Sequence, residues 1–124
     1  MQGILCVGIG GFIGACLRYV VSLYSSKIFG TQFPYGTLIV NITGGILIGL
    51  IMELSLSTDL ISPNLRLFLT TGIMGGLTTF STFSYETINL LSDGEYFFGS
   101  LNICLNLFLS LFGVIAGKFI SQLI

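Results

Sequence analysis

Residues Gly75 to Glu86 read GGLTTFSTFSYE, a polar run inside a segment that is otherwise apolar enough to cross a lipid bilayer. The run combines two adjacent glycines, five serine or threonine hydroxyls and two phenylalanines. Glycines and β-branched threonines weaken a continuous helix. Lipid penalises every backbone or hydroxyl group left without a partner. We therefore predict that this helix is broken within the membrane, and that the break forms a permeation site.

The composition is that of an integral membrane protein. Of the 124 residues, 53% are hydrophobic and 7% are charged, and the mean hydropathy is +1.01. In soluble domains roughly a quarter of the residues are charged. Four apolar stretches each reach the ~20 residues that a spanning helix needs, and only short polar links join them. The sequence predicts an all-α protein with a single transmembrane domain over residues 1–124, with helices at about Gly3–Tyr24, Phe33–Leu54, Asn64–Leu91 and Tyr96–Leu123.

Positive charges are divided evenly between the two membrane sides that four such helices define. Arg66 and Lys118 flank the side that holds both termini, and Arg18 and Lys27 flank the other side. The bias that normally orients a membrane protein is therefore missing. We expect copies of the chain to insert in both orientations and to pair as an antiparallel homodimer, which reproduces the inverted repeat that transporters encode within one chain.

Each predicted helix also carries a GxxxG pattern, which places two glycines on one helix face and lets backbones approach closely. Tight helix packing is the expected role of these pairs, although the third pair adjoins the polar run. The pairs are Gly10 with Gly14, Gly45 with Gly49, Gly72 with Gly76, and Gly113 with Gly117. A bundle of four helices fills its own core, so a conduction path must lie between chains.

Few residues could support catalysis. The chain has no histidine, and Glu53 and Glu86 are the only carboxylates within the predicted helices. Its three cysteines lie in apolar segments without metal-binding spacing. A nucleophile with a base, or a metal centre, cannot be assembled from these residues. We predict that the protein is not an enzyme, and we expect no nucleic-acid partner.

The predicted membrane interior instead offers hydrogen-bond donors without charge. Amide and hydroxyl hydrogens can replace the water around a small, strongly hydrated anion without trapping the ion as a buried cation would. Hydrogen bonding between helices is the alternative role, and for Thr37, Ser84 and Ser110 the two roles are equally supported. The donors are Thr37, Asn41, Thr78, Thr79, Ser81, Thr82, Ser84, Asn102, Asn106 and Ser110.

Helical spacing arranges these donors in two stripes. Asn102, Asn106 and Ser110 are four residues apart and so line one face of the last helix, and Thr78, Ser81 and Thr82 are predicted to share a face of the third helix. The two stripes together predict a polar track.

Phe80 and Phe83 lie three residues apart among the hydroxyls, which places both rings on one side of the third helix. The edges of an aromatic ring carry partial positive charge. Two such edges in a narrow path can face a halide that has lost part of its water shell. Packing in a core is the usual role of phenylalanine at this spacing, but the surrounding hydroxyls favour a functional role here.

The predicted break would also leave backbone carbonyls free, and carbonyl oxygens suit a small monovalent cation. In an antiparallel dimer the two breaks can meet on the two-fold axis and hold such a cation structurally. Arg18 would cost about 2.5 to 3.5 kcal/mol at the membrane centre. We expect it near a helix end, bound to backbone carbonyls or lining a vestibule, and we expect Glu86 to cap a partner or shape the pore mouth.

Three motifs resemble the small fluoride channels of the Fluc family, which is also called CrcB. They are GGFIGACLRY (Gly10–Tyr19), YGTLIVNITGG (Tyr35–Gly45) and GIMGGLTTFSTFSYE (Gly72–Glu86), in the order and spacing of that family. The resemblance covers almost the whole chain. It implies a channel for passive fluoride efflux in the cell inner membrane or plasma membrane, surrounded by lipid and built as an antiparallel, dual-topology homodimer with two pores at its interface.

The resemblance also implies roles for individual residues. The amide of Asn41 would face fluoride, the ring edges of Phe80 and Phe83 would contact it, and the carbonyls of Gly75 and Thr78 would hold a central, structural sodium ion. The last helix departs from the family, because some members have tyrosine where Asn102 aligns. The expected fluoride pathway comprises Asn41, Thr79, Phe80, Ser81, Thr82, Phe83, Asn102, Asn106 and Ser110.

A proton-coupled exporter of the small multidrug type is the alternative function, because it shares the size, the helix count and the even charge balance. Such an exporter needs a carboxylate that faces a central cavity. The first helix has none, and Glu86 is the only candidate.

Overall fold

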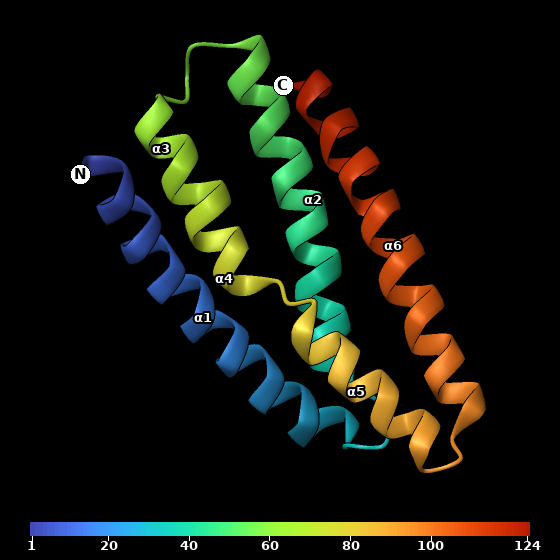
Figure 1. The fold of residues 1–124 in the computed structure, drawn as a ribbon. Coiled ribbons are helices and arrows are strands. Elements are labelled where there is room, and N and C mark those ends of the chain that lie inside the picture. The colour runs from blue at the N-terminus through green and yellow to red at the C-terminus, as the bar shows by residue number, and fades with distance from the viewer.

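The computed structural model describes all residues, 1–124, and is helical throughout, as predicted (Figure 1). Three helices are long and apolar enough to cross a membrane by themselves, namely α1 (Gln2–Phe29), α2 (Tyr35–Ser57) and α6 (Tyr96–Leu123). The segment predicted to form the third transmembrane helix is divided into α3 (Pro63–Leu67), η1 (Phe68–Met74), α4 (Gly75–Leu77) and α5 (Ser81–Ser92).

Two helices run further than the sequence predicts. The first continues past its predicted end at Tyr24 and ends at Gly30, whose φ of 84° is accessible to glycine at little cost. The second includes Ser57, whose hydroxyl donates to the Glu53 carbonyl at 2.8 Å. Serine can bond back to the preceding helical turn in this way, so a serine-rich end need not stop a helix.

The predicted break in the third helix is present and lies at Thr78–Phe80, between α4 and α5. The two glycines that suggested it remain helical, and the backbone leaves the helical region at Thr78, where ψ is 157°. Before the break, the N–H of Gly75 reaches the carbonyl of Thr70, which is one residue further back than in an α-helix. The helix is therefore loosened over η1 and interrupted just after it.

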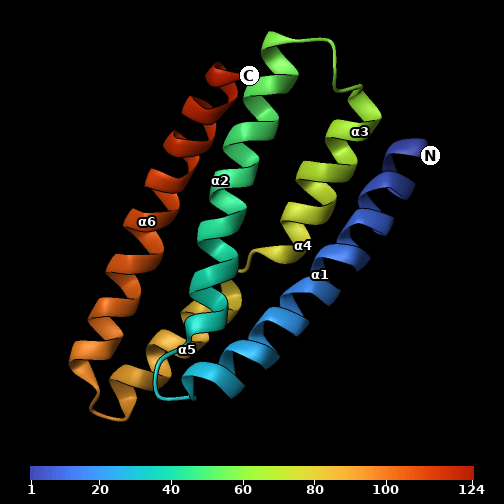
Figure 2. The same ribbon diagram turned by 180° about the vertical axis from the view of Figure 1, so that it is seen from behind.

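The third segment changes neighbours at the break. Its first half, η1 and α4, packs on α1, whereas α5 packs on α6 (Figures 1 and 2). Both views show α5 displaced from the axis of α4 toward the side where α6 lies. A single apolar stretch thus contributes to two different helix pairs.

The GxxxG glycines lie at the two closest helix contacts, as predicted. A Cβ on Gly72 would lie 2.9 Å from the Cα of Gly10 in α1, and a Cβ on Gly45 would lie 2.7 Å from the Ser110 carbonyl in α6. Side chains do not fit at such distances, so these glycines are needed for the helices to meet. The packing role includes the pair that adjoins the polar run, since Gly76 packs against Gly11.

The internal core is small. Only 21 of the 124 residues are buried, and the buried apolar cluster consists of Val40, Met74 and Leu77. Large apolar side chains cover the outside of the bundle instead. This distribution suits a bundle that contacts lipid or a second protein chain over most of its surface.

Candidate functional site

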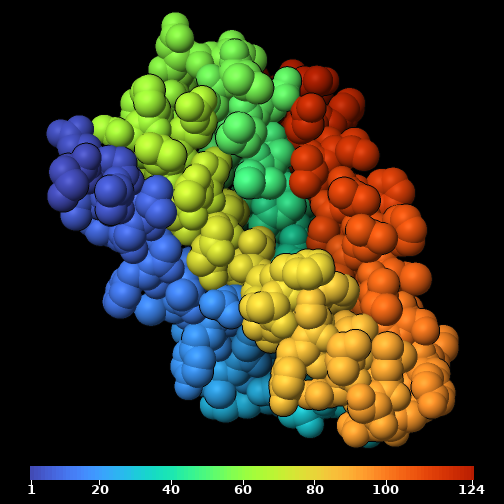
Figure 3. All heavy atoms as spheres, in the orientation of Figure 1, coloured from blue at the N-terminus to red at the C-terminus, as the bar shows by residue number.

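A groove with a volume of about 540 Å³ lies between α2, α6 and the broken third segment. Figure 3 shows this face hollowed between the third segment and α6, with α2 recessed between them. No charged side chain lines the groove. The predicted site residues that line it are Asn41, Gly75, Thr78, Thr79, Phe80, Phe83, Asn106 and Ser110.

Asn41 of α2 holds the break in place. Its Oδ1 accepts the backbone N–H of Thr79 at 2.9 Å, and its Nδ2 donates to the Thr79 carbonyl at 3.2 Å. The same Nδ2 donates to Oδ1 of Asn106 in α6 at 2.9 Å. One side-chain amide thus replaces helix hydrogen bonds that the break removes, which matters because no water is available in the bilayer core. Both Nδ2 hydrogens of Asn41 are engaged.

The break also frees backbone carbonyls. In a continuous helix the N–H of Thr79 would bond to the Gly75 carbonyl, and the N–H of Thr82 to that of Thr78. Here the Thr79 N–H bonds to Asn41, and the Thr82 N–H bonds to the Thr79 hydroxyl at 3.1 Å. Gly75 and Thr78, the two residues expected to hold a cation, therefore both have carbonyls without a helical donor.

The two phenylalanines of the polar run lie side by side at the groove. Their ring centroids are 5.6 Å apart and the ring planes are inclined by 52°. Phe80 is 78% exposed in the single chain, although it lies at the middle of the third segment. An aromatic ring so exposed contributes little to the core of its own chain, and both rings present atoms to the same space as Asn41 and Ser110.

Ser110 and Asn106 bring donors from α6 to the groove. The hydroxyl oxygen of Ser110 is buried and has no hydrogen-bond partner. A buried hydroxyl normally finds a partner, so one without a partner in a groove is a donor available to a ligand. Asn106 presents its Oδ1 toward Asn41, and its Nδ2 donates to Asn102.

Comparison with known proteins identifies the family. The family described as "CrcB-like protein, Camphor Resistance (CrcB)" matches residues 5–118. The chain belongs to the CrcB family. The resemblance inferred from the three motifs is thereby confirmed.

Curated relatives align with almost the whole chain and are named "Fluoride-specific ion channel FluC". The relative from Clostridium novyi is 59% identical over 120 residues, which are 97% of this chain and 94% of the relative. The relative from Clostridium perfringens strain 13 is 58% identical with the same coverage. The relative from Geobacter sulfurreducens is 50% identical over 117 residues, which are 94% of each chain.

The prediction of a polar stripe on the third helix is wrong. Thr78, Ser81 and Thr82 were expected to share a helix face, but the break separates Thr78 from the other two. The Thr78 hydroxyl donates to the Met74 carbonyl at 2.9 Å, while Ser81 is exposed and lies 3.5 Å from the Thr79 hydroxyl. Neither Ser81 nor Thr82 lines the groove. The expectation used the period of an uninterrupted helix, which does not hold across Thr78–Phe80.

Arg18 lies outside the groove. Its Nε donates to the Gly76 carbonyl at 3.0 Å. Because the break interrupts the helix just after Gly76, the Arg18 side chain of α1 takes the place of a donor from the next helical turn. The contact with a backbone carbonyl was expected, but the expected position near a helix end is wrong, because α1 continues to Phe29 and Arg18 lies in its middle, beside the break.

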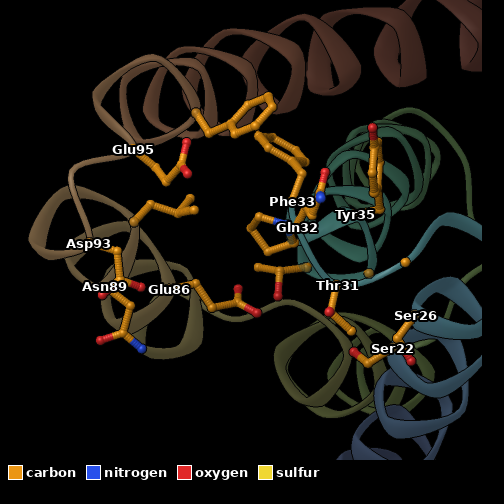
Figure 4. A pocket seen from close by; sticks show the side chains of 16 residues that line it. Ser22, Ser26, Thr31, Gln32, Phe33, Tyr35, Glu86, Asn89, Asp93 and Glu95 are labelled. Carbon is orange, nitrogen blue, oxygen red and sulfur yellow. The ribbon is translucent and has the colours of Figure 1, made fainter.

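Glu86 lines a second cavity of about 560 Å³, at the end of the bundle where the links α1–α2 and α5–α6 lie (Figure 4). One oxygen of Glu86 is buried without a partner, and Thr37 lies in the same cavity. The acidic residues Asp93 and Glu95 also line it, from a link that the sequence presents only as a turn. The cavity is polar and lies at the end of the bundle, away from Thr78–Phe80, and the expected role of Glu86 at a pore mouth stays a prediction.

Asn102 differs from its predicted neighbours on α6. It is fully buried and does not line the groove. Its Nδ2 donates to the hydroxyl of Thr87 in α5 at 2.9 Å. Thr87 is a further polar residue that the sequence analysis missed, because a threonine in the middle of a helix carries no signal of its partner.

Proposed function

We propose that this CrcB-family chain forms a passive, fluoride-selective channel through which fluoride leaves the cytoplasm. The observation that carries the proposal is the groove, where neutral donors and two phenylalanine rings line one space without any charged side chain. Such a lining can replace the water of a small anion step by step, and it holds the ion too weakly to stop its passage. The name shared by the curated relatives supports fluoride as that anion.

A second chain is needed to complete the path. The groove is open along one face of a single chain, and large apolar side chains such as Phe80, Leu107 and Leu111 lie exposed along it. A lone chain would leave the polar groove open to lipid. An antiparallel partner would close it, and two-fold symmetry would give the dimer two grooves and hence two paths.

The freed carbonyls suit a structural sodium ion at the centre of this dimer. The carbonyl oxygens of Gly75 and Thr78 lack helical donors, and both residues line the open face. A sodium ion held by these oxygens from two chains would join the two breaks across the symmetry axis. Its positive charge would favour anions in both adjacent paths.

The hydrogen bonds at the groove also suggest how the anion advances. The buried Ser110 hydroxyl has no hydrogen-bond partner to release, whereas both Nδ2 hydrogens of Asn41 are already bonded. Asn41 can therefore donate to fluoride only when it releases the Thr79 carbonyl or the Asn106 amide oxygen. This exchange keeps both Asn41 hydrogens bonded while the ion passes, and the acceptor that Asn41 releases regains its donor once the ion has left.

Fluoride efflux from liposomes tests this function. We expect purified protein in liposomes to release fluoride down its gradient far faster than empty liposomes, measured with a fluoride electrode while valinomycin balances the charge. Chloride release should stay near the level of empty liposomes. Equal fluoride release from both preparations would exclude a fluoride channel.

The same preparation separates the channel from a coupled exporter. A channel should conduct fluoride at equal internal and external pH, because the groove has no titratable side chain. Release that occurs only with an imposed proton gradient would instead favour the exporter.

A further inference from the structure

The buried amide of Asn102 on α6 does not line the groove and is connected by hydrogen bonds both to α5 and to the break that precedes it. We infer that Asn102 is a positioning residue: it fixes the side chains that shape the permeation site and does not contact the ion. This inference rests on the proposed function for its effect on flux. Its structural part, the connection between Asn102 and the break, can be measured separately.

The first half of the connection runs from Asn102 to α5. Asn102 Nδ2 donates to the Thr87 hydroxyl at 2.9 Å, and this hydroxyl donates to the Phe83 carbonyl at 2.7 Å. Thr87 is 5% exposed and Asn102 is 0% exposed, so water does not compete for these bonds. Asn102 is thus tied to the helical turn that carries one of the two groove phenylalanines.

The second half runs from Asn102 to the break itself. Asn106 Nδ2 donates to both the Oδ1 and the backbone carbonyl of Asn102, at 2.9 Å each. Asn106 then uses its own Oδ1 to accept from Asn41, which holds the backbone of Thr79. Thr79, which precedes α5, and Phe83, which lies in its first turn, are therefore connected through the side-chain amides of Asn106 and Asn102 on α6.

The direction of these bonds is determined by the backbone groups at the two ends. The Thr79 N–H can only donate and the Phe83 carbonyl can only accept. Each side chain between them must therefore accept a hydrogen bond on the side of Thr79 and donate one on the side of Phe83. A flipped Asn106 amide would place its NH₂ group against the NH₂ group of Asn41. Asn102 prevents that flip, because it offers Asn106 two acceptors and no donor.

The fixed orientation of Asn106 determines how Asn41 bonds to the backbone of the break. With Asn106 fixed, Asn41 always has an acceptor on its α6 side and keeps its Oδ1 on the Thr79 N–H. Without the Asn102 side chain, the Asn106 amide would lose its Oδ1 acceptor in a buried setting and would keep only the backbone carbonyl of residue 102, so it would be freer to turn toward the acceptors of Asn41. Loss of Asn102 should thus loosen the break from a distance.

Two positions test the inference in the full-length protein. Asn102→Leu removes the amide at similar size, and Thr87→Val removes only the hydroxyl that anchors it. Thr87→Ser keeps the hydroxyl and should restore most of the function. Ser121→Ala serves as the matched control, because Ser121 is also buried on α6 and bonds to a helix carbonyl, but lies far along the helix from the groove.

The decisive measurement is amide hydrogen exchange at Thr79 in reconstituted protein. Loss of one buried hydrogen bond should speed this exchange about tenfold in Asn102→Leu and Thr87→Val, and fluoride efflux should fall by a similar factor. The melting temperature should change no more than it does in Ser121→Ala. Thr87→Val replaces the hydroxyl by a methyl group and Thr87→Ser removes the methyl group but keeps the hydroxyl, so an effect of general misfolding at this site would appear in both variants.

The outcomes are distinguishable. Unchanged Thr79 exchange in both Asn102→Leu and Thr87→Val would overturn the inference, whatever the flux. Faster exchange with unchanged fluoride flux would also overturn it, since permeation would then not depend on how Asn102 positions the break. If the unmodified protein carries no fluoride, the proposed function fails, but the exchange result still decides whether Asn102 holds the break.

Discussion

Fluoride efflux should fall by more than about 100-fold, which is about 2.7 kcal/mol in activation free energy, when Phe80 or Phe83 is replaced by isoleucine. Isoleucine fills a similar space but has no ring edge with partial positive charge. Phe80 is 78% exposed in the single chain, so its replacement leaves the core of that chain intact. Efflux of fluoride from liposomes, at matched protein content, measures the effect.

A phenylalanine away from the groove provides the control for this pair. Phe119 on α6 is also highly exposed, at 61%, and does not line the groove. Phe119→Ile should conduct fluoride like the unmodified protein. If Phe80→Ile and Phe83→Ile also conducted normally, the rings would be packing residues and the groove would not be the fluoride path.

The second large effect concerns the contact between α2 and α6. A Cβ on Gly117 would meet the Ile46 carbonyl and would lie 2.8 Å from the Leu50 backbone nitrogen. These are backbone atoms of a long helix and cannot move aside singly. Gly117→Ala should therefore destabilise the protein by about 3 kcal/mol, the upper end of the usual cost of overpacking. Thermal unfolding in detergent, followed by the loss of monodisperse protein, measures it.

Gly8→Ala is the matched control for Gly117→Ala. Gly8 also lies inside a long helix, α1, but a Cβ there meets no other atom within 4 Å. Both substitutions improve helix propensity equally. A difference between them therefore reports only the contact. Equal stability of the two variants would mean that α2 and α6 do not pack as closely as described.

Much of the fold could be predicted from the sequence because few physical signals compete in a membrane. The lengths of the apolar stretches determine the number of crossings, and glycines followed by threonines indicate where a helix is interrupted. The change of neighbours at Thr78–Phe80 could not be predicted. A break moves every residue after it to a new face, by an amount that depends on what the two halves pack against.

The site was predictable in its residue types and less so in its contacts. Phe80 and Phe83 are close in sequence, so their spacing sufficed to place them together. Asn41 and Thr79 are 38 residues apart, and no periodicity connects them. Asn102 and Asn106 lie on one face as expected, yet only the packing of α5 determines that Asn102 is buried while Asn106 reaches the groove.

The central claim is that two copies inserted in opposite directions complete the groove. It is proposed from a polar groove that is open on one face of a single chain, and from a sequence whose four positive charges show no excess on either predicted side of the membrane. A uniform orientation would allow no antiparallel pair. Orientation in the native membrane is therefore the property on which the account depends.

Labelling of one cysteine from outside the cell tests this claim most directly. Ser92, at the exposed end of α5, can be replaced by cysteine after the three native cysteines are changed to alanine. A maleimide that cannot cross the membrane should label about half of the molecules in intact cells and the rest only after permeabilisation, as expected for both orientations. Labelling of nearly all molecules from one side, or of almost none, would contradict the antiparallel dimer.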